Sequence, residues 1–157
     1  MSKNYIGLDN NKVEGIVKSL NDYLANLNLL YVKLHNLHWN VQGHSFFQLH
    51  AVFEGYYEGV AKSLDEVAER ILTLGARPYA SMKEYLENAT LKELESKGLS
   101  GDEAIDVLEG DFLAMLKDSR ELLSTAEEAD DYGTASLMEG LISEYEKALW
   151  MIKSYKA

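Results

Sequence analysis

Four histidines are the residues of this sequence whose type and spacing most directly suggest chemistry. They are His35, His38, His44 and His50, the complete histidine content of the chain, and they fall within a window of sixteen positions. Imidazole nitrogen is a common ligand of transition metals, and the chain has no cysteine to supply thiolate ligands. A single histidine on an apolar helix face more often packs or caps a helix. It is therefore the clustering that favours a metal site made of histidine and carboxylate.

His38 and His50 are the two histidines that helical periodicity turns inward. His38 follows Leu34 by one turn on an apolar face, and His50 lies on the apolar face of the next predicted helix. Glu54 comes one turn after His50, so its carboxylate and the imidazole project to the same side. These three residues are candidate metal ligands.

A pair of carboxylates forms the second candidate feature. Asp65 and Glu69 are four residues apart in the segment SLDEVAERIL, among apolar neighbours. At ~100° per residue, Asp65 lies about 60° and Glu69 about 100° around the helix from His50, away from a plainly solvated face. Two interpretations stay open at this point. Either the carboxylates bind a metal cation, or Glu69 pairs with Arg70 or another cation at the edge of the bundle and Asp65 is simply exposed.

The composition restricts the fold that could position these residues. The chain has 157 residues, 46% of them hydrophobic, with one proline. This suits one domain of long helices over residues 1–157, with a front tail of about ten residues.

The excess of 26 acidic over 15 basic residues gives a net charge of −11, which disfavours nonspecific binding to nucleic acid or to an anionic membrane. The sequence shows neither a signal peptide nor an apolar run of about 18 residues. We therefore expect a soluble, cytoplasmic protein without a membrane partner.

Apolar residues recur at alternating steps of three and four over four segments, which predicts four helices. The first expected helix covers about residues 11–41, and the apolar faces of the other three run over residues 46–74, 105–126 and 138–155. Reciprocal capping pairs are expected at three helix starts: Asn11 with Glu14, Ser45 with Gln48, and Ser100 with Glu103. Gly43 and Gly75 fit the left-handed position that follows a helix, and Pro78 prevents the second helix from resuming.

The connection over residues 76–100 is too long for a tight turn. Within it, Ser81 and Glu84 predict a capped short helix that runs through Leu86. The other two connections are short, so each should join antiparallel neighbours. The predicted fold is therefore all-α: a four-helix bundle with one long crossover that carries a short extra helix.

Helix geometry decides whether the candidate ligands can meet. His50 and Asp65 are fifteen residues apart on one predicted helix, roughly 22 Å at 1.5 Å per residue, too far to bind one metal ion within a chain. The Glu-x-x-His motif that builds di-iron sites inside single bundles does not occur in the sequence. If two copies of the second helix pack antiparallel about a two-fold axis, the histidines of one chain can meet the carboxylates of the other. Symmetry then makes two such sites.

Four stretches of the sequence resemble the Dps family, the miniferritins named for the DNA-binding protein from starved cells. They are KLHNLHWNVQGHSFFQLH (33–50), LDEVAERILTLGARP (64–78), LENAT (86–90) and ALWMIK (148–153), and the similarity runs from about residue 13 to 155. The resemblance implies a ferritin-like subunit in a hollow homo-dodecamer with metal sites at two-fold interfaces. It also implies a ferroxidase, an enzyme that oxidises Fe²⁺ with hydrogen peroxide and stores the ferric mineral, protecting against oxidative stress.

Carried over position by position, the resemblance also assigns residues to the iron site. The ligands are His38 of the HW pair, His50 after FFQL, and Asp65 and Glu69 of DEVAER, with Glu54 as a supporting or second-iron ligand. Neither His35 nor His44 has an assigned role. Trp39 matches a family tryptophan near the centre and is a candidate electron relay, although ordinary packing is at least as good an account.

Acidic residues before the last predicted helix are candidates for a negatively charged pore at a three-fold axis, where the family takes up iron. They are Glu127, Glu128, Asp130 and Asp131. An acidic connection that merely keeps the surface soluble is the equal alternative.

The alternative function is a DNA-compacting, nucleoid-associated protein with secondary iron binding. Direct DNA binding needs several cationic contacts, and family members that bind DNA often have a tail rich in lysine or arginine. Here the front segment MSKNYIGLDN has Lys3 offset by Asp9, and the final KSYKA has Lys153 and Lys156. We therefore expect DNA binding to be weak or absent at physiological salt. A helical scaffold or antigen without metal chemistry is a third interpretation that the helical pattern alone leaves open.

Overall fold

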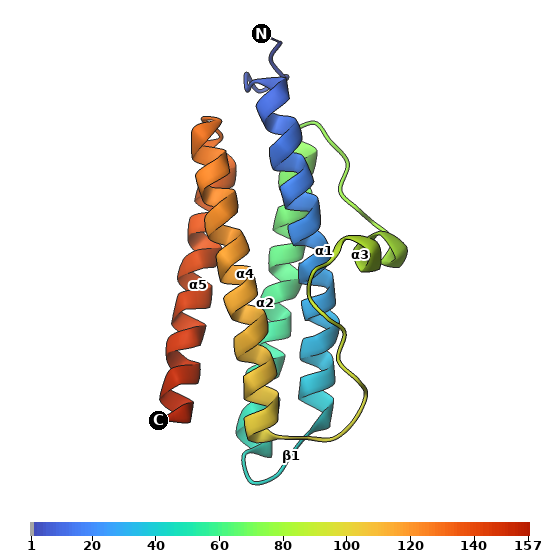
Figure 1. Cartoon of the computed structure of the whole chain (residues 1–157), viewed down its shortest axis with the longest axis vertical. Coiled ribbons are helices and arrows are strands. Elements are labelled where there is room, and N and C mark those ends of the chain that lie inside the picture. The colour runs from blue at the N-terminus through green and yellow to red at the C-terminus, as the bar shows by residue number, and fades with distance from the viewer. Residues whose placement is uncertain (1) are drawn as a thin grey trace.

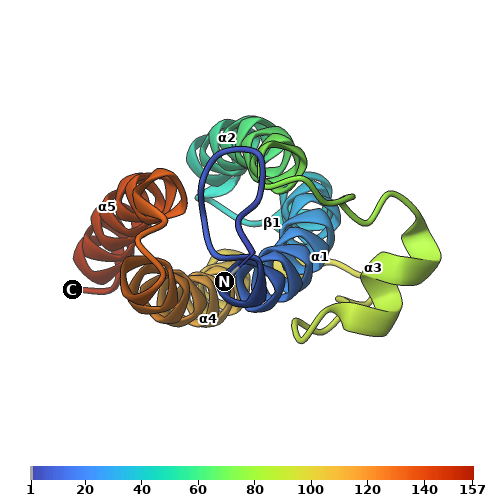
Figure 2. The same ribbon diagram turned by 90° about the horizontal axis from the view of Figure 1, so that it is seen from above.

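Two helical hairpins make up the bundle (Figure 1). In the computed structural model, which describes residues 2–157, α1 (Asn10–Asn40) packs against α2 (Phe46–Thr73), and α4 (Gly101–Glu128) packs against α5 (Tyr132–Lys156). The hairpins meet mainly through α1 and α4, and there is less contact between α2 and α5, as the view along the bundle shows (Figure 2). The predicted all-α four-helix bundle is confirmed.

The long connection between the hairpins runs along the outside of α1. It carries α3 (Met82–Asn88), close to the expected short helix, and α3 packs on α1 (Figure 1). The chain then reaches the other end of the bundle, where β2 (Leu99–Ser100) pairs in parallel with β1 (Val41–Gln42). This two-residue ladder has no periodicity that a sequence could reveal. It ties the start of α4 to the end of α1.

Several predicted helix boundaries are confirmed. Reciprocal capping boxes form at the starts of α3 and α4, with Ser81 and Glu84 in one and Ser100 and Glu103 in the other. Gly43 and Gly75 follow α1 and α2 with φ values of 109° and 91°, a conformation that a residue with a Cβ adopts only with strain. The first hairpin connection and the long crossover therefore both begin where the sequence indicated.

Two predicted caps are wrong. α1 begins earlier than expected because the side chain of Asp9 accepts a 2.9 Å hydrogen bond from the backbone amide of Asn11, so Asn11 and Glu14 do not form the cap. Ser45 precedes α2 with φ −91° and ψ 8° and makes no side-chain capping bond. In this conformation its hydroxyl does not reach the amides that an extended N-cap residue would serve.

The apolar face of α1 lies at the centre of the core. All eight positions of its predicted face are buried: Val13, Ile16, Leu20, Tyr23, Leu27, Leu30, Leu34 and Leu37. The predicted face of α2 is less completely covered, because Phe46, His50 and Tyr57 are half-buried. The histidine end of α2 is thus the less enclosed part of the bundle. None of the helices within residues 2–157 combines the length and the apolar character that crossing a membrane requires.

A buried ion pair joins α1 to α4. Lys33 Nζ lies 2.9 Å from Oδ1 and 2.7 Å from Oδ2 of Asp111, with side chains 8% and 11% exposed. Within the described part of the chain, Oδ2 accepts no hydrogen bond of good geometry. Burial raises the pKa of Asp111 although Lys33 acts in the opposite direction. Loss of hydration therefore outweighs the attraction to Lys33 in setting the pKa of this carboxylate, and for such a buried pair the cost of dehydration can equal the gain from charge attraction.

Removing one partner of this pair should destabilise the protein, whereas replacing both should not. Asp111→Ala leaves a buried ammonium without a counter-charge, so we expect the free energy of unfolding to fall by about 3–5 kcal/mol. The Lys33→Met/Asp111→Leu double variant should equal or exceed the wild type in denaturant unfolding at a fixed subunit concentration.

The same pair should also affect stability as a function of pH. Because the folded-state pKa of Asp111 is raised, its unfavourable contribution should be absent below the ordinary pKa of aspartate. It should develop as the pH rises from that ordinary value to the raised value, and it should be fully present above the raised pKa. If Lys33→Met/Asp111→Leu were as unstable as Asp111→Ala in denaturant unfolding, this account of the ion pair would be contradicted.

Candidate metal centre

His38 and His50 lie against each other where the first hairpin turns. His38 is in the last turn of α1 and is buried, with 6% of its surface exposed, and His50 is half-buried near the start of α2. Their rings stack with centroids 3.6 Å apart and planes 13° apart. The short connection between antiparallel helices thus brings together two rings that are twelve residues apart in sequence.

Each imidazole is oriented by the backbone of the other helix. His38 Nδ1 donates to the carbonyl oxygen of His50 at 2.6 Å, and His50 Nδ1 donates to the carbonyl oxygen of His38 at 2.7 Å. Because a carbonyl can only accept, both Nδ1 atoms carry hydrogen, and neutral rings keep the lone pair on Nε2. A hydrogen bond from the non-ligating nitrogen to a carbonyl is the arrangement typical of metal-bound histidine. The pair therefore offers two oriented Nε2 donors.

Aromatic rings extend from this pair to the surface. Tyr57 lies edge-on to His38, with centroids 5.3 Å apart, and stacks on His35 at 3.9 Å. Trp39 follows at 5.3 Å from His35 and is 69% exposed. Trp39, the candidate electron relay, is thus connected to the histidine pair through ring contacts. His38, its neighbour in sequence, points in the other direction, into the bundle.

Glu54 lies on the same helix as His50 and is oriented by Tyr57. The Tyr57 hydroxyl donates a 3.1 Å hydrogen bond to Glu54 Oε1, and loss of hydration, together with this carboxylate, raises the pKa of Tyr57. The phenol therefore stays protonated and remains a donor. Glu54 is exposed, so its second oxygen stays accessible to a cation.

Asp65 and Glu69 occupy the other half of α2. Both are exposed, and neither carboxylate makes a hydrogen bond or ion pair within residues 2–157. Arg70 turns to α5 and pairs with Asp131 at 2.5 Å, so the alternative in which Glu69 pairs with Arg70 is wrong. The two carboxylates thus remain available to a cation.

The two halves of the candidate centre do not meet inside one chain. Across residues 2–157, no three histidine, aspartate or glutamate side chains gather as a metal ion would require. The histidine pair lies at one end of α2 and Asp65 and Glu69 lie toward the other. A centre that uses both halves requires a second chain.

The four acidic pore candidates have different environments. Glu127 and Glu128 are exposed in the last turn of α4 rather than in a loop, and Asp130 is exposed with φ 57°. The prediction for Asp131 is wrong, because its side chain is fully buried against Arg70. It also accepts from the Thr134 amide as the N-cap of α5, so that helix begins at Tyr132, directly after the acidic residues.

Sequence reasoning missed the contact of Tyr57 with Glu54 and the partner of Arg70. Tyr57 follows Glu54 by three residues on α2, a spacing that places the two side chains side by side, so the phenol could have been found. The partner of Arg70 could not, because Asp131 is 61 residues away in sequence.

The fold and sequence define a ferritin-like protein. Residues 17–156 match the ferritin-like domain family, which is nearly the whole bundle. Similarity to individual proteins narrows the family assignment. The chain is 37% identical over 140 residues to DNA protection during starvation protein 2 of Bacillus anthracis, covering 89% of this chain and 95% of that one. It is 38% identical over 136 residues to the DNA protection during starvation protein of Brevibacillus brevis, covering 87% and 91%.

A solved structure agrees with these relatives. The Dps protein of Vibrio cholerae O1, described as a member of a broad superfamily of ferritin-like diiron-carboxylate proteins, has a TM-score of 0.95 at 39% identity. The match covers 100% of this chain and 98% of that one. The chain therefore belongs to the Dps family of ferritin-like proteins.

Proposed function

We propose that this protein is a cytoplasmic ferroxidase that oxidises Fe²⁺ with hydrogen peroxide and stores the ferric product inside a hollow dodecamer, protecting against oxidative stress. The observation that carries the proposal is the division of ligands along α2. Two oriented Nε2 donors lie at one end, and two carboxylates without partners in the described chain lie toward the other. The kinship with a ferritin-like diiron-carboxylate protein supports iron as the metal.

The complete site forms between two subunits. When α2 packs antiparallel on its copy, His38 and His50 of one chain face Asp65 and Glu69 of the other, and a two-fold axis generates two sites. Imidazole nitrogen and carboxylate oxygen suit Fe²⁺. Glu54, oriented by Tyr57, provides a ligand beside His50 for a second iron.

The chemistry needs two electrons for each peroxide. Two Fe²⁺ ions supply them in the balanced reaction 2Fe²⁺ + H₂O₂ + 2H⁺ → 2Fe³⁺ + 2H₂O. Oxidising both ions together avoids the one-electron reduction that releases hydroxyl radical. The net charge of −11 on each chain attracts Fe²⁺ to the assembly, and the exposed Glu127, Glu128 and Asp130 are candidates to line its uptake pore.

The iron site can be tested by titrating the protein with Fe²⁺ without oxygen and then adding peroxide. Loss of both nitrogen donors in His38→Gly/His50→Gly should slow iron oxidation by about tenfold or more. His44→Gly is the matched control, because His44 is an exposed histidine outside the site. Equal consumption of iron and peroxide by all three proteins would show that the site is wrongly assigned.

Mixed assemblies extend this test to the intersubunit arrangement. His38→Gly/His50→Gly chains and Asp65→Asn/Glu69→Gln chains should each be inactive alone. Co-assembled in equal amounts, they should recover about a quarter of the sites, because random pairing unites intact histidines with intact carboxylates that often. If each site were built within one chain, the mixed assembly would recover no ferroxidase activity. A stable monomer of 17.7 kDa that oxidised iron at these residues would also contradict the arrangement.

Trp39 is a proposed electron relay for the same reaction. The ring contacts through His35 and Tyr57 to His38 support this role, since each step is between 3.9 and 5.3 Å. With less than one Fe²⁺ per site, peroxide should oxidise Trp39 and produce an organic radical detectable by electron paramagnetic resonance. Trp39→Phe should remove or change this signal, while Trp150→Phe, an exposed tryptophan on α5, should not. An unchanged signal in Trp39→Phe would leave packing as its role.

Direct DNA binding is proposed to be weak or absent. The front segment folds back on its own subunit, where the Tyr5 hydroxyl donates to the Thr73 carbonyl at 2.6 Å. At the other end, Lys156 forms ion pairs with Asp106 and Glu109. With Lys156 neutralised, the two end segments offer few cations, Lys3 and Lys153, to displace counterions from DNA.

A gel-shift assay at neutral pH and physiological salt, roughly 0.15 M, should therefore show plasmid migrating freely. The control adds a stretch of lysines before residue 1, which should retard the plasmid and should lose that effect as salt increases. Tight retention of plasmid by the wild type under these conditions would favour the DNA-compacting alternative.

A further inference from the structure

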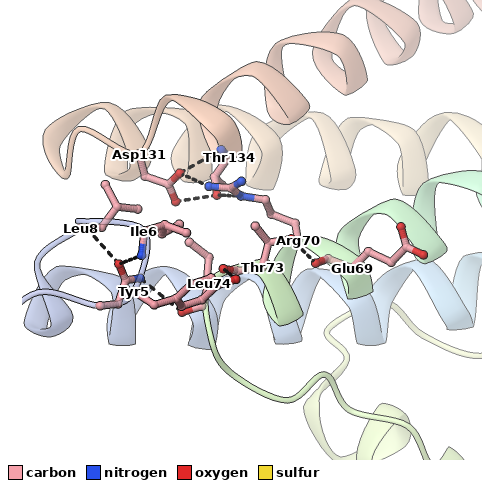
Figure 3. A network of polar contacts seen from close by, with 10 residues as sticks. Tyr5, Ile6, Leu8, Glu69, Arg70, Thr73, Leu74, Asp131 and Thr134 are labelled. Carbon is pink, nitrogen blue, oxygen red and sulfur yellow. Dashed lines mark hydrogen bonds and ion pairs between the residues drawn. The ribbon is translucent and has the colours of Figure 1, made fainter.

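Arg70 links the end of α2 to the start of α5 (Figure 3). Its Nη2 donates to Asp131 Oδ1 at 2.5 Å and its Nε donates to Thr134 Oγ1 at 3.0 Å. The Asp131 side chain is fully buried and that of Arg70 is 18% exposed. Asp131 also accepts from the amide and the hydroxyl of Thr134, at 3.1 and 2.6 Å. One carboxylate thus caps α5 and neutralises the guanidinium.

The first turn of α5 is shaped to receive this guanidinium. A Cβ at residue 133 would lie 2.5 Å from Arg70 Nη1 and 2.6 Å from its Cζ, closer than real contacts allow. Only glycine leaves that space open. Since α2 and α5 belong to different hairpins with little contact between them, this bidentate link is a main attachment of the end of α2 to the second hairpin.

The opposite side of the same helix end is held by the front segment. Tyr5 donates to the carbonyl of Thr73 at 2.6 Å, and the Asn4 amide donates to the carbonyl of Leu74 at 3.4 Å. The Thr73 hydroxyl in turn donates to the carbonyl of Glu69 at 2.8 Å. The turn of α2 that carries Glu69 is therefore fixed from two sides, by α5 and by residues 4 and 5.

The direction of Arg70 also matters for charge. An arginine free on the surface could reach the neighbouring carboxylate and compete with a metal cation for it. Figure 3 shows the guanidinium turned toward Asp131 and Thr134, and the Glu69 carboxylate pointing away from it. Because Asp131 holds the guanidinium, the Glu69 carboxylate is not paired with Arg70.

We infer that Arg70 and Asp131 are positioning residues for the carboxylate half of the iron site. Their ion pair fixes the end of α2 and withholds the arginine charge from Glu69, and Gly133 provides the space that this requires. The inference rests on the proposed function, because it assumes that Asp65 and Glu69 bind the metal.

The test measures metal binding instead of turnover, with Co²⁺ as the probe, since its visible absorption reports coordination geometry. Anaerobic Co²⁺ titrations of assembled Arg70→Ala and Gly133→Ala should show affinity about tenfold weaker than wild type, with altered absorption bands. Arg70→Lys keeps the charge that Asp131 holds and should restore part of the affinity lost in Arg70→Ala. Asp131→Asn keeps an N-cap acceptor but removes the charge, so it should behave like Gly133→Ala.

Two further variants make the outcome decisive. Lys62→Ala removes an exposed ion pair with Glu66 on the same helix and should bind Co²⁺ as the wild type does. Glu69→Gln should lose binding. Wild-type affinity and bands in assembled Arg70→Ala, with binding lost in Glu69→Gln, would overturn the positioning role and leave the proposed function standing. Weaker Co²⁺ binding that only accompanies dissociation of the assembly, as measured by sedimentation, would overturn the positioning role in the same way. Wild-type binding by Glu69→Gln would instead overturn the proposed site itself.

Discussion

α2 is one unbroken helix of 28 residues, and its rigid rise keeps His50 and Glu69 apart at opposite ends of the subunit. No rearrangement of side chains can close a distance that the backbone hydrogen bonds of a helix maintain. The ligand types suited to iron are all present, yet a single chain does not assemble them. In the proposed iron site, the requirement for a second copy therefore comes from the length of one helix, whose two ends the rest of the subunit presents.

The histidine end is preorganised by the turn of the first hairpin. Each ring donates its Nδ1 hydrogen to the backbone of the opposite helix, so tautomer and orientation are chosen before any metal arrives. The half-site is thus prepared by main-chain atoms, which substitutions of nearby side chains cannot remove.

The carboxylate end depends on contacts between hairpins. Asp131 belongs by sequence to an acidic run, yet it is buried as the helix cap and as the counter-charge of Arg70. Glu127, Glu128 and Asp130 remain exposed beside it. The negative charge at this corner therefore divides into one structural carboxylate and several that remain accessible to solvent and cations.

The sequence by itself determined the helices, the crossover and the candidate ligands, because 3.6-residue periodicity, glycine stops and capping boxes act over a few residues. It also excluded a site within one chain, since the rise of a helix is the same in every protein. Tertiary structure alone decided the ladder between Val41 and Leu99, the stacking of the histidines, and the partner of Arg70. These contacts join residues from different elements, and their energies arise only when those elements pack together, so no local pattern records them.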